Sequence, residues 1–155
     1  MPTTGDRVPI YTPEQRARRD ATRWTVVQGV LAPVQFLVFG VSLALVLRFL
    51  WTGEGYALAT GSVILKTAIL YAIMVTGAMW EKVVFGRYLL APAFFWEDVV
   101  SFGVIALHTL YLLALALGWS AEAQMTVALA AYAAYVVNAA QFLRKLRLAR
   151  TGVAA

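Results

Sequence analysis

Acidic residues are concentrated in the segment WEKVVFGRYLLAPAFFWEDVVSF, which covers positions 80–102. Glu97 and Asp98 are adjacent at the start of a long apolar run, and Glu81 lies at the end of the preceding run. Adjacent carboxyls walled by aromatic rings can retain a proton near neutral pH, because desolvation and like-charge proximity both disfavour the ionised form. Such a group can donate a proton in catalysis. Alternatively, these acids form interfacial ion pairs with Lys82 and Arg87 that fix the loop.

Other polar side chains interrupt the apolar runs. Lys66 lies near the middle of the second run, and helical rise places His108 of the third at nearly the same depth. Asn138, Gln141 and Gln28 fall near the depth of the two adjacent carboxyls. Polar groups at membrane depth usually face the interior and mark functional sites. Hydrogen bonding between helices is the simpler role for the amides, and a structural role is the more common one for a lone buried histidine.

These residues belong to four stretches that are long enough to cross a bilayer. The 155-residue chain is 61% hydrophobic and 14% charged, with a mean hydropathy of +0.73, unlike a soluble domain. A span needs about 20 apolar residues, and the runs cover residues 24–47, 56–80, 94–119 and 123–143. We expect an all-α polytopic membrane protein with an antiparallel four-helix bundle over residues 24–146. A basic extension, 1–23, precedes the bundle, and a tail, 147–155, follows it.

Lysine and arginine are strongly segregated between the two sides of the expected bundle. One side holds Arg48 alone, and Lys66 lies within a span. Because short cytoplasmic loops carry the excess of positive charge, we expect both chain ends to be cytoplasmic, an N-in/C-in topology. The other eleven basic residues are Arg7, Arg16, Arg18, Arg19, Arg23, Lys82, Arg87, Arg144, Lys145, Arg147 and Arg150.

Several classes of function are disfavoured by the composition. The chain has no cysteine and one histidine, which excludes disulfides, thiolate sites and multi-histidine metal sites within the chain. Phosphate-binding glycine loops and nucleophile elbows are absent from the sequence. The basic residues lie at the ends of apolar runs, so we expect them to contact anionic lipid headgroups and not nucleic acid.

Three segments carry a resemblance to a known family. They read YTPEQRARRDATRWTVVQGVLAPVQFLVFGVSL, WEKVVFGRYLLAPAFFWEDVVSF and AAYAAYVVNAAQFLRKL, and they resemble the vinyl bacteriochlorophyllide hydratases of bacteriochlorophyll biosynthesis. The resemblance runs from about Tyr11 to Leu146. It implies a lyase of the bacterial inner (cytoplasmic or intracytoplasmic) membrane. This enzyme would add water to the C3-vinyl group of chlorophyllide a or bacteriochlorophyllide and give the 3-(1-hydroxyethyl) derivative. It implies no redox cofactor and no protein metal site, because the magnesium belongs to the substrate.

The resemblance also suggests roles for individual residues. Glu97 or Asp98 would be the general acid and the other would stay ionised to stabilise a cation, with Glu81 the next candidate. His108 would be an axial ligand of the substrate magnesium, although it lies about 16 Å along the helix from the carboxyls. The other expected substrate-binding residues are the rings of Trp80, Phe94, Phe95 and Trp96, which would stack on the macrocycle, and the amides of Asn138, Gln141 and Gln28.

Two other classes of function compete with the enzyme. A pigment-binding or assembly factor would use the same pocket without chemistry, and a small transport or scaffold subunit would also need a polar interior. The absence of detectable inverted repeats weakens the transport interpretation. The partners expected from the resemblance are a tetrapyrrole and the lipid bilayer. Association between copies of the chain, or with other pigment-biosynthesis enzymes, is compatible with it.

Overall fold

The structure is a computed structural model that describes residues 9–150, and within that range it is all-helical. A short helix, α1 (Pro13–Ala21), precedes the long helices α2 (Arg23–Thr52) and α3 (Tyr56–Phe85). A 3-10 turn, η1 (Pro92–Phe94), leads into α4 (Phe95–Ala116), and α5 (Ala121–Arg150) follows. Four of these segments are long and apolar enough to cross a membrane, which confirms the predicted all-α polytopic fold. Arg7, with the rest of residues 1–8, and residues 151–155 of the expected tail lie outside the described residues.

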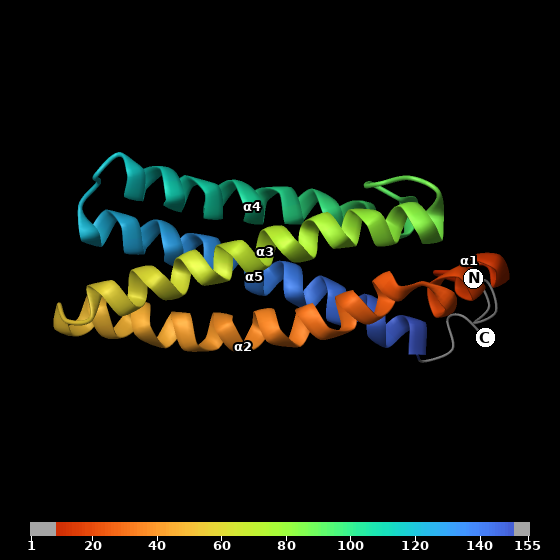
Figure 1. Cartoon of the computed structure of the whole chain (residues 1–155), viewed down its shortest axis with the longest axis horizontal. Coiled ribbons are helices and arrows are strands. Elements are labelled where there is room, and N and C mark those ends of the chain that lie inside the picture. Colours follow the sequence, from red (N-terminus) through yellow and green to blue (C-terminus); the bar gives the residue numbers. More distant parts are fainter. Residues whose placement is uncertain (1–8, 151–155) are drawn as a thin grey trace, which may run out of the picture.

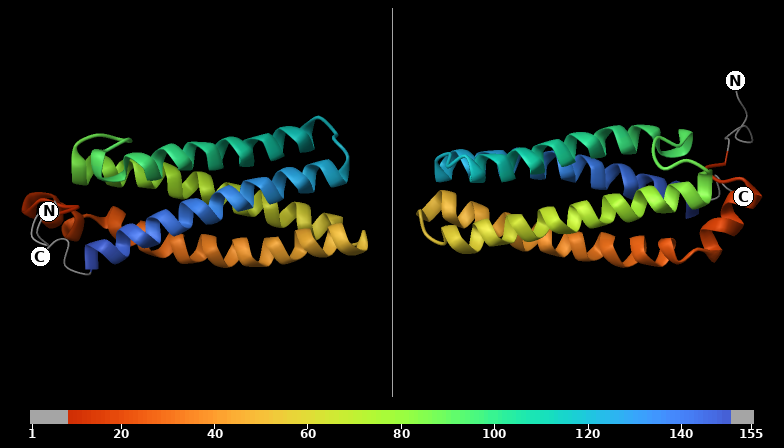
Figure 2. Two further views of the ribbon diagram at one scale, coloured as in Figure 1. Left: turned by 180° about the vertical axis from the view of Figure 1, so that it is seen from behind. Right: turned by 45° about the horizontal axis from the view of Figure 1, so that its top comes forward.

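The bundle consists of two antiparallel hairpins, α2 with α3 and α4 with α5. Packing within each hairpin is much more extensive than packing between them. The four long helices run along the long axis of the molecule, and the views from two other directions agree (Figures 1 and 2). Helix α1, the loop of residues 86–91 and the last turns of α5 lie together at one end, which we call the α1 end. The expected site residues at positions 80–98 therefore lie at the α1 end.

Local signals set the ends of the long helices. The Thr22 side chain accepts a hydrogen bond from the Trp24 amide at 3.3 Å and caps the start of α2. Helices α2 and α3 stop at Gly53 and Gly86, whose φ angles of +75° and +83° are left-handed and cost glycine little. Helices α2, α3 and α5 extend past the spans expected from hydropathy, because a helix can continue into the interfacial region beyond the hydrocarbon core.

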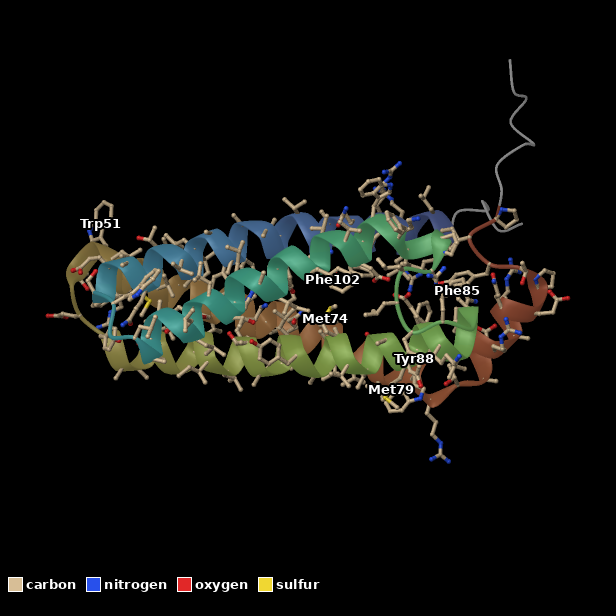
Figure 3. The ribbon with its side chains drawn as sticks, turned by 90° about the horizontal axis from the view of Figure 1, so that it is seen from above. Trp51, Met74, Met79, Phe85, Tyr88 and Phe102 are labelled. Atoms are coloured by element: carbon tan, nitrogen blue, oxygen red, sulfur yellow. The ribbon has the colours of Figure 1, made fainter. Side chains whose placement is uncertain are left out.

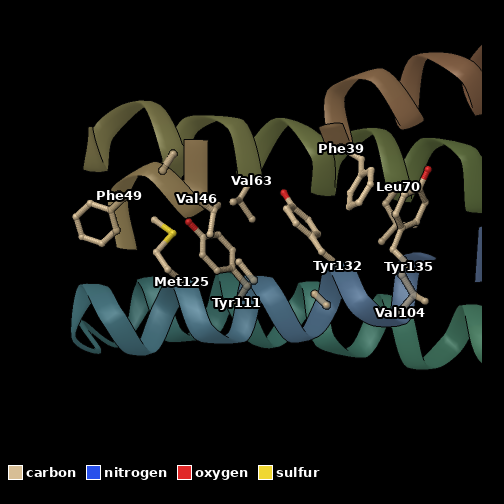
Figure 4. Packing of buried hydrophobic residues seen from close by; sticks show 13 residues of the cluster. Phe39, Val46, Phe49, Val63, Leu70, Val104, Tyr111, Met125, Tyr132 and Tyr135 are labelled. Carbon is tan, nitrogen blue, oxygen red and sulfur yellow. The ribbon is translucent and has the colours of Figure 1, made fainter. Parts of the chain in front are cut away.

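The outer surface is apolar and the interior is mixed. Val30, Leu37 and Val75 are among the large apolar side chains that lie exposed, as suits a surface whose solvent is lipid. Aromatic side chains fill much of the interior, and Figure 4 shows Tyr111 and Tyr132 among the residues packed between the hairpins. The core is therefore formed where the two hairpins meet.

The interior is less tightly closed toward the α1 end. No residue is buried over 23–34 of α2 or over 71–80 of α3, whereas both helices contribute buried residues further along. Figure 3 shows Trp51 at the far end of the bundle, Phe85 and Tyr88 at the α1 end, and Met74 and Phe102 between. Met74 is only partly buried and Phe102 is exposed. The half of the bundle that contains Glu81, Glu97 and Asp98 is thus the more accessible half.

Candidate functional site

Glu81 of α3 and Asp98 of α4 form a buried carboxyl pair at the α1 end. The two residues are 5% and 3% exposed, and their carboxyl groups lie close enough to interact. Burial and like-charge proximity both disfavour two ionised carboxylates at such a site, which favours sharing of one proton. The pair is therefore suited to hold one proton and one negative charge.

The same two carboxyls fix the loop between α3 and α4. The Leu90 amide donates to Asp98 Oδ2 at 2.9 Å, and the Ala91 amide donates to Glu81 Oε2 at 3.3 Å. Leu90 has a φ of +61°, a left-handed conformation that costs a residue other than glycine about 1–3 kcal/mol. The hydrogen bonds to the carboxyls help to hold this conformation.

Lys82 near the end of α3 and Arg87 of the loop are the basic residues for which the sequence left ion pairs with these acids open. Lys82 Nζ donates to the Gly86 carbonyl at 3.1 Å and lies 5.4 Å from the centre of the Tyr88 ring. Arg87 is exposed. Backbone hydrogen bonds to the carboxyl pair therefore constrain the loop, together with the charge of Arg87.

Glu97 faces α5, whereas its neighbour Asp98 faces α3. Glu97 is 6% exposed, and its Oε1 lies 3.6 Å from Lys145 Nζ. Lys145 also donates to the Ala93 carbonyl. The ammonium group compensates the charge of a carboxylate that is almost removed from solvent. Two carboxyls adjacent in sequence thus have different surroundings.

Asn138 joins α4 to α5 beside Glu97. Ser101 Oγ donates to Asn138 Oδ1 at 2.9 Å, and Asn138 Nδ2 donates to the Glu97 carbonyl at 3.0 Å. The same Nδ2 lies 3.2 Å from Gln141 Oε1. The polar layer expected at the depth of the carboxyls is therefore present, and it contains both amides predicted from α5.

A pocket of about 350 Å³ opens beside Glu97 between α4 and α5. Phe95 and Trp96 lie in it edge to face, with ring centres 5.2 Å apart, and Trp96 is 68% exposed. The pocket thus combines accessible aromatic surface with charge. Its lining residues are Pro92, Phe95, Trp96, Glu97, Gln141, Arg144 and Lys145.

An aromatic cluster fills the bundle next to the carboxyl pair; it consists of Tyr11, Trp80, Phe85, Phe94 and Phe142. The ring centres of Trp80 and Phe94 are 5.5 Å apart at nearly right angles, and Phe142 stacks on Phe94 at 6.1 Å. Burial raises the pKa of the Tyr11 phenol, so this hydroxyl is neutral. Trp80 and Phe94 contact other rings here, and their predicted stacking on a macrocycle stays a prediction.

Gln28 and Trp80, both expected at the substrate, join α2 to α3. Gln28 Nε2 donates to Thr76 Oγ1 at 2.6 Å, and Trp80 Nε1 donates to Thr25 Oγ1 at 2.9 Å. Both side chains lie on the part of these helices that has no buried residues. Each therefore has a structural partner in the more accessible half of the bundle.

The N-terminal helix α1 is held against the end of α3, an arrangement that the sequence did not predict. Arg18 donates to the Val84 carbonyl from Nε at 3.1 Å and from Nη2 at 2.8 Å. The Arg19 guanidinium lies 4.6 Å from the centre of the Tyr11 ring. A cation is favourable at the C-terminal end of a helix, where carbonyl groups lack partners. The cluster of arginines in this extension was the available signal for such a contact.

Lys66 and His108 meet at the centre of the bundle, as their equal depths suggested. Lys66 Nζ lies 3.3 Å from His108 Nε2 and 3.8 Å from the centre of the Tyr135 ring. His108 Nδ1 donates to the Val104 carbonyl at 2.8 Å. Both ring nitrogens are thus engaged and both residues are fully buried. Ligation of a metal by Nε2 would require Lys66 to move.

The comparisons with known proteins agree on one family. Residues 11–148 match the family described as 2-vinyl bacteriochlorophyllide hydratase. A relative of that name from Cereibacter sphaeroides is 72% identical over 141 residues, which cover 91% of this chain and 88% of the relative. One of the same name from Rhodobacter capsulatus is 68% identical over 149 residues, which cover 96% and 87%. No solved structure matches the chain.

Proposed function

The chain belongs to the 2-vinyl bacteriochlorophyllide hydratase family, and from this premise we propose that its buried carboxyls hydrate the C3-vinyl group of a chlorophyllide-type macrocycle. The chain is a hydro-lyase of bacteriochlorophyll biosynthesis and a multi-pass membrane protein. The product is the 3-(1-hydroxyethyl) derivative. Adding water changes no net oxidation level, so the step uses no redox cofactor, and the magnesium ion enters as part of the substrate.

The reaction needs a general acid that protonates a vinyl carbon and a general base that takes a proton from the attacking water. Proton transfer to the terminal vinyl carbon converts the double bond into a methyl group and leaves positive charge on the inner carbon, where the conjugated ring delocalises it. A water oxygen then forms a bond to that carbon and loses a proton to the base. The net reaction adds one water molecule to the substrate and moves one proton from the acid to the base. Proton exchange with solvent then restores both groups.

The three carboxyls divide these roles according to their surroundings. Asp98 donates the proton, because its pair with Glu81 keeps one out of bulk water. Glu97 stabilises the cation and accepts the proton from water. Gln141 lines the same pocket as Glu97 and orients the water. The exposed rings of the pocket provide apolar surface for the macrocycle.

One observation carries this assignment: in a chain of this family, three carboxyls, Glu81, Glu97 and Asp98, are buried at the accessible end of the bundle. The experiment is to incubate membranes containing the protein with vinyl chlorophyllide in water labelled with heavy oxygen. We expect a blue-shifted absorption band and a product that has gained one labelled water. In deuterium oxide the new methyl group should carry one carbon-bound deuterium. Pigment that binds without forming product would favour a non-catalytic pigment-binding factor.

We propose that the α1 end faces the cytoplasm, with the bundle in the bacterial inner membrane. The support is the segregation of charge: Lys82, Arg87 and Lys145 lie at the α1 end, whereas Arg48 and Glu54 pair at 3.9 Å at the other end. Because the chain has no cysteine, a single introduced cysteine reports directly on which side of the membrane its position lies. We expect Glu54→Cys to react with an impermeant maleimide in intact spheroplasts, and Arg87→Cys to react only after lysis.

Both positions are exposed, so the two variants are matched controls for reactivity. Labelling of both after lysis confirms that the thiols are accessible. Labelling of Arg87→Cys in intact spheroplasts, with Glu54→Cys protected, would reverse the orientation.

His108→Phe separates ligation of the substrate magnesium from a structural role. Since both imidazole nitrogens have protein partners, we expect unchanged affinity for vinyl chlorophyllide. Loss of the partner of buried Lys66 should lower the free energy of unfolding by about 2 kcal/mol. Pigment fluorescence quenching and thermal unfolding in detergent measure the two effects. A large loss of pigment affinity in a folded variant would instead support the axial-ligand prediction.

A further inference from the structure

The pocket between α4 and α5 has a net charge that complements a single anion. Arg144 and Lys145 contribute two positive charges and Glu97 one negative charge, which leaves +1. Lys145 already contacts Glu97 and the Ala93 carbonyl. Arg144 makes no hydrogen bond or ion pair with any residue in the part of the chain that the structure describes. The pocket therefore holds a cation that is available to a ligand.

The size of the pocket fits part of a large ligand and not the whole of it. A volume of about 350 Å³ is at the lower limit of small-molecule sites. A tetrapyrrole is larger than this, so one edge of the macrocycle with its side arm would occupy the pocket. The exposed aromatic surface of Phe95 and Trp96 suits the apolar edge, and the guanidinium suits an anionic arm.

We propose that Arg144 binds the free propionate carboxylate of the substrate and thereby selects the free-acid pigment over its esters. This inference rests on the proposed function, since a chlorophyllide is by its chemistry the free acid of the pigment. The propionate and the vinyl group are carried by neighbouring pyrrole rings. A carboxylate held at Arg144 therefore anchors the macrocycle at the pocket that also contains Glu97. A monoanion suits the pocket better than a dianionic phosphate, because Glu97 repels additional negative charge.

The test compares vinyl chlorophyllide with its methyl ester in vesicles of zwitterionic phosphatidylcholine. For the unmodified protein we expect a KM about tenfold lower for the free acid than for the ester, with similar kcat. Arg144→Gln should raise the KM for the acid about tenfold and leave the KM for the ester unchanged, so that discrimination disappears. Arg144→Lys should recover part of it, because an ammonium group keeps the charge without the planar fork.

Arg150→Gln is the matched control, since it removes one exposed arginine from the same helix outside the pocket. It should retain the preference for the acid. Equal KM values for acid and ester in the unmodified protein would overturn the inference while leaving hydration established. An Arg144→Gln defect that is equal for both substrates would also overturn it. A defect that appears only when anionic lipid is added would overturn it too and would indicate a lipid headgroup site. Failure of the unmodified protein to hydrate either substrate would instead refute the proposed function.

Discussion

Asp98→Asn and Glu81→Gln are each expected to lower the rate of vinyl hydration by about 10³-fold, the effect of removing a general acid. Asparagine and glutamine are nearly isosteric with the acids, and their carbonyl oxygens can still accept the Leu90 and Ala91 amides. The loop should therefore persist. Asp98→Asn removes the proposed donor itself, and Glu81→Gln removes the neighbouring carboxyl that favours a proton on Asp98. Turnover per mole of folded protein in vesicles measures the effect, with thermal unfolding of each variant as the check on folding.

The double variant provides a further criterion. If Glu81 and Asp98 share one proton, removing the second carboxyl adds little to the loss from removing the first, because the two act as a unit. Independent roles would instead give losses that multiply. Glu122→Gln is a suitable control, since it removes an exposed acid at the opposite end of the bundle. Full activity in both folded single variants would remove the pair from the mechanism.

The positions of the long helices were predictable because the length of an apolar run sets what can cross a bilayer. The depth of a side chain follows from counting residues along a helix, and this brought Lys66 and His108 together before any contact was known. Asn138 and Gln141 were placed beside the carboxyls by the same reasoning. These predictions depend on rise along the helix alone.

The partners of the individual carboxyls were not predictable from the sequence, because they depend on how the helices rotate and pack. Glu97 and Asp98 are about 100° apart around α4, so one faces α5 and the other faces α3. Which carboxyl meets Lys145, 48 positions away from Glu97, is decided by tertiary packing. The left-handed backbone at Leu90 was likewise not predictable, because its stability depends on hydrogen bonds to those carboxyls.

Lys145→Met is the variant expected to lose most stability. Its ammonium is the partner of Glu97, whose side chain is 8% exposed, and removing one member of a buried pair leaves the other charge uncompensated. We expect the free energy of unfolding to fall by about 3 kcal/mol. Hydration should fall by about 100-fold, because Glu97 loses the partner that holds it in position to accept a proton from water. Lys82→Met, which removes an exposed lysine, should change the stability by less than about 0.5 kcal/mol.

Adding Glu97→Gln to Lys145→Met separates the structural contribution of the pair from its chemical one. The neutral amide removes the uncompensated charge, so the double variant should be more stable than Lys145→Met alone, although both lack the Lys145 contact with the Ala93 carbonyl. Activity should not recover with stability, since glutamine cannot accept the proton from water. Thermal unfolding and turnover of the four proteins in the cycle measure both effects. If the double variant were no more stable than Lys145→Met, Lys145 would not be compensating a charge on Glu97. Another group would then have to serve as the base.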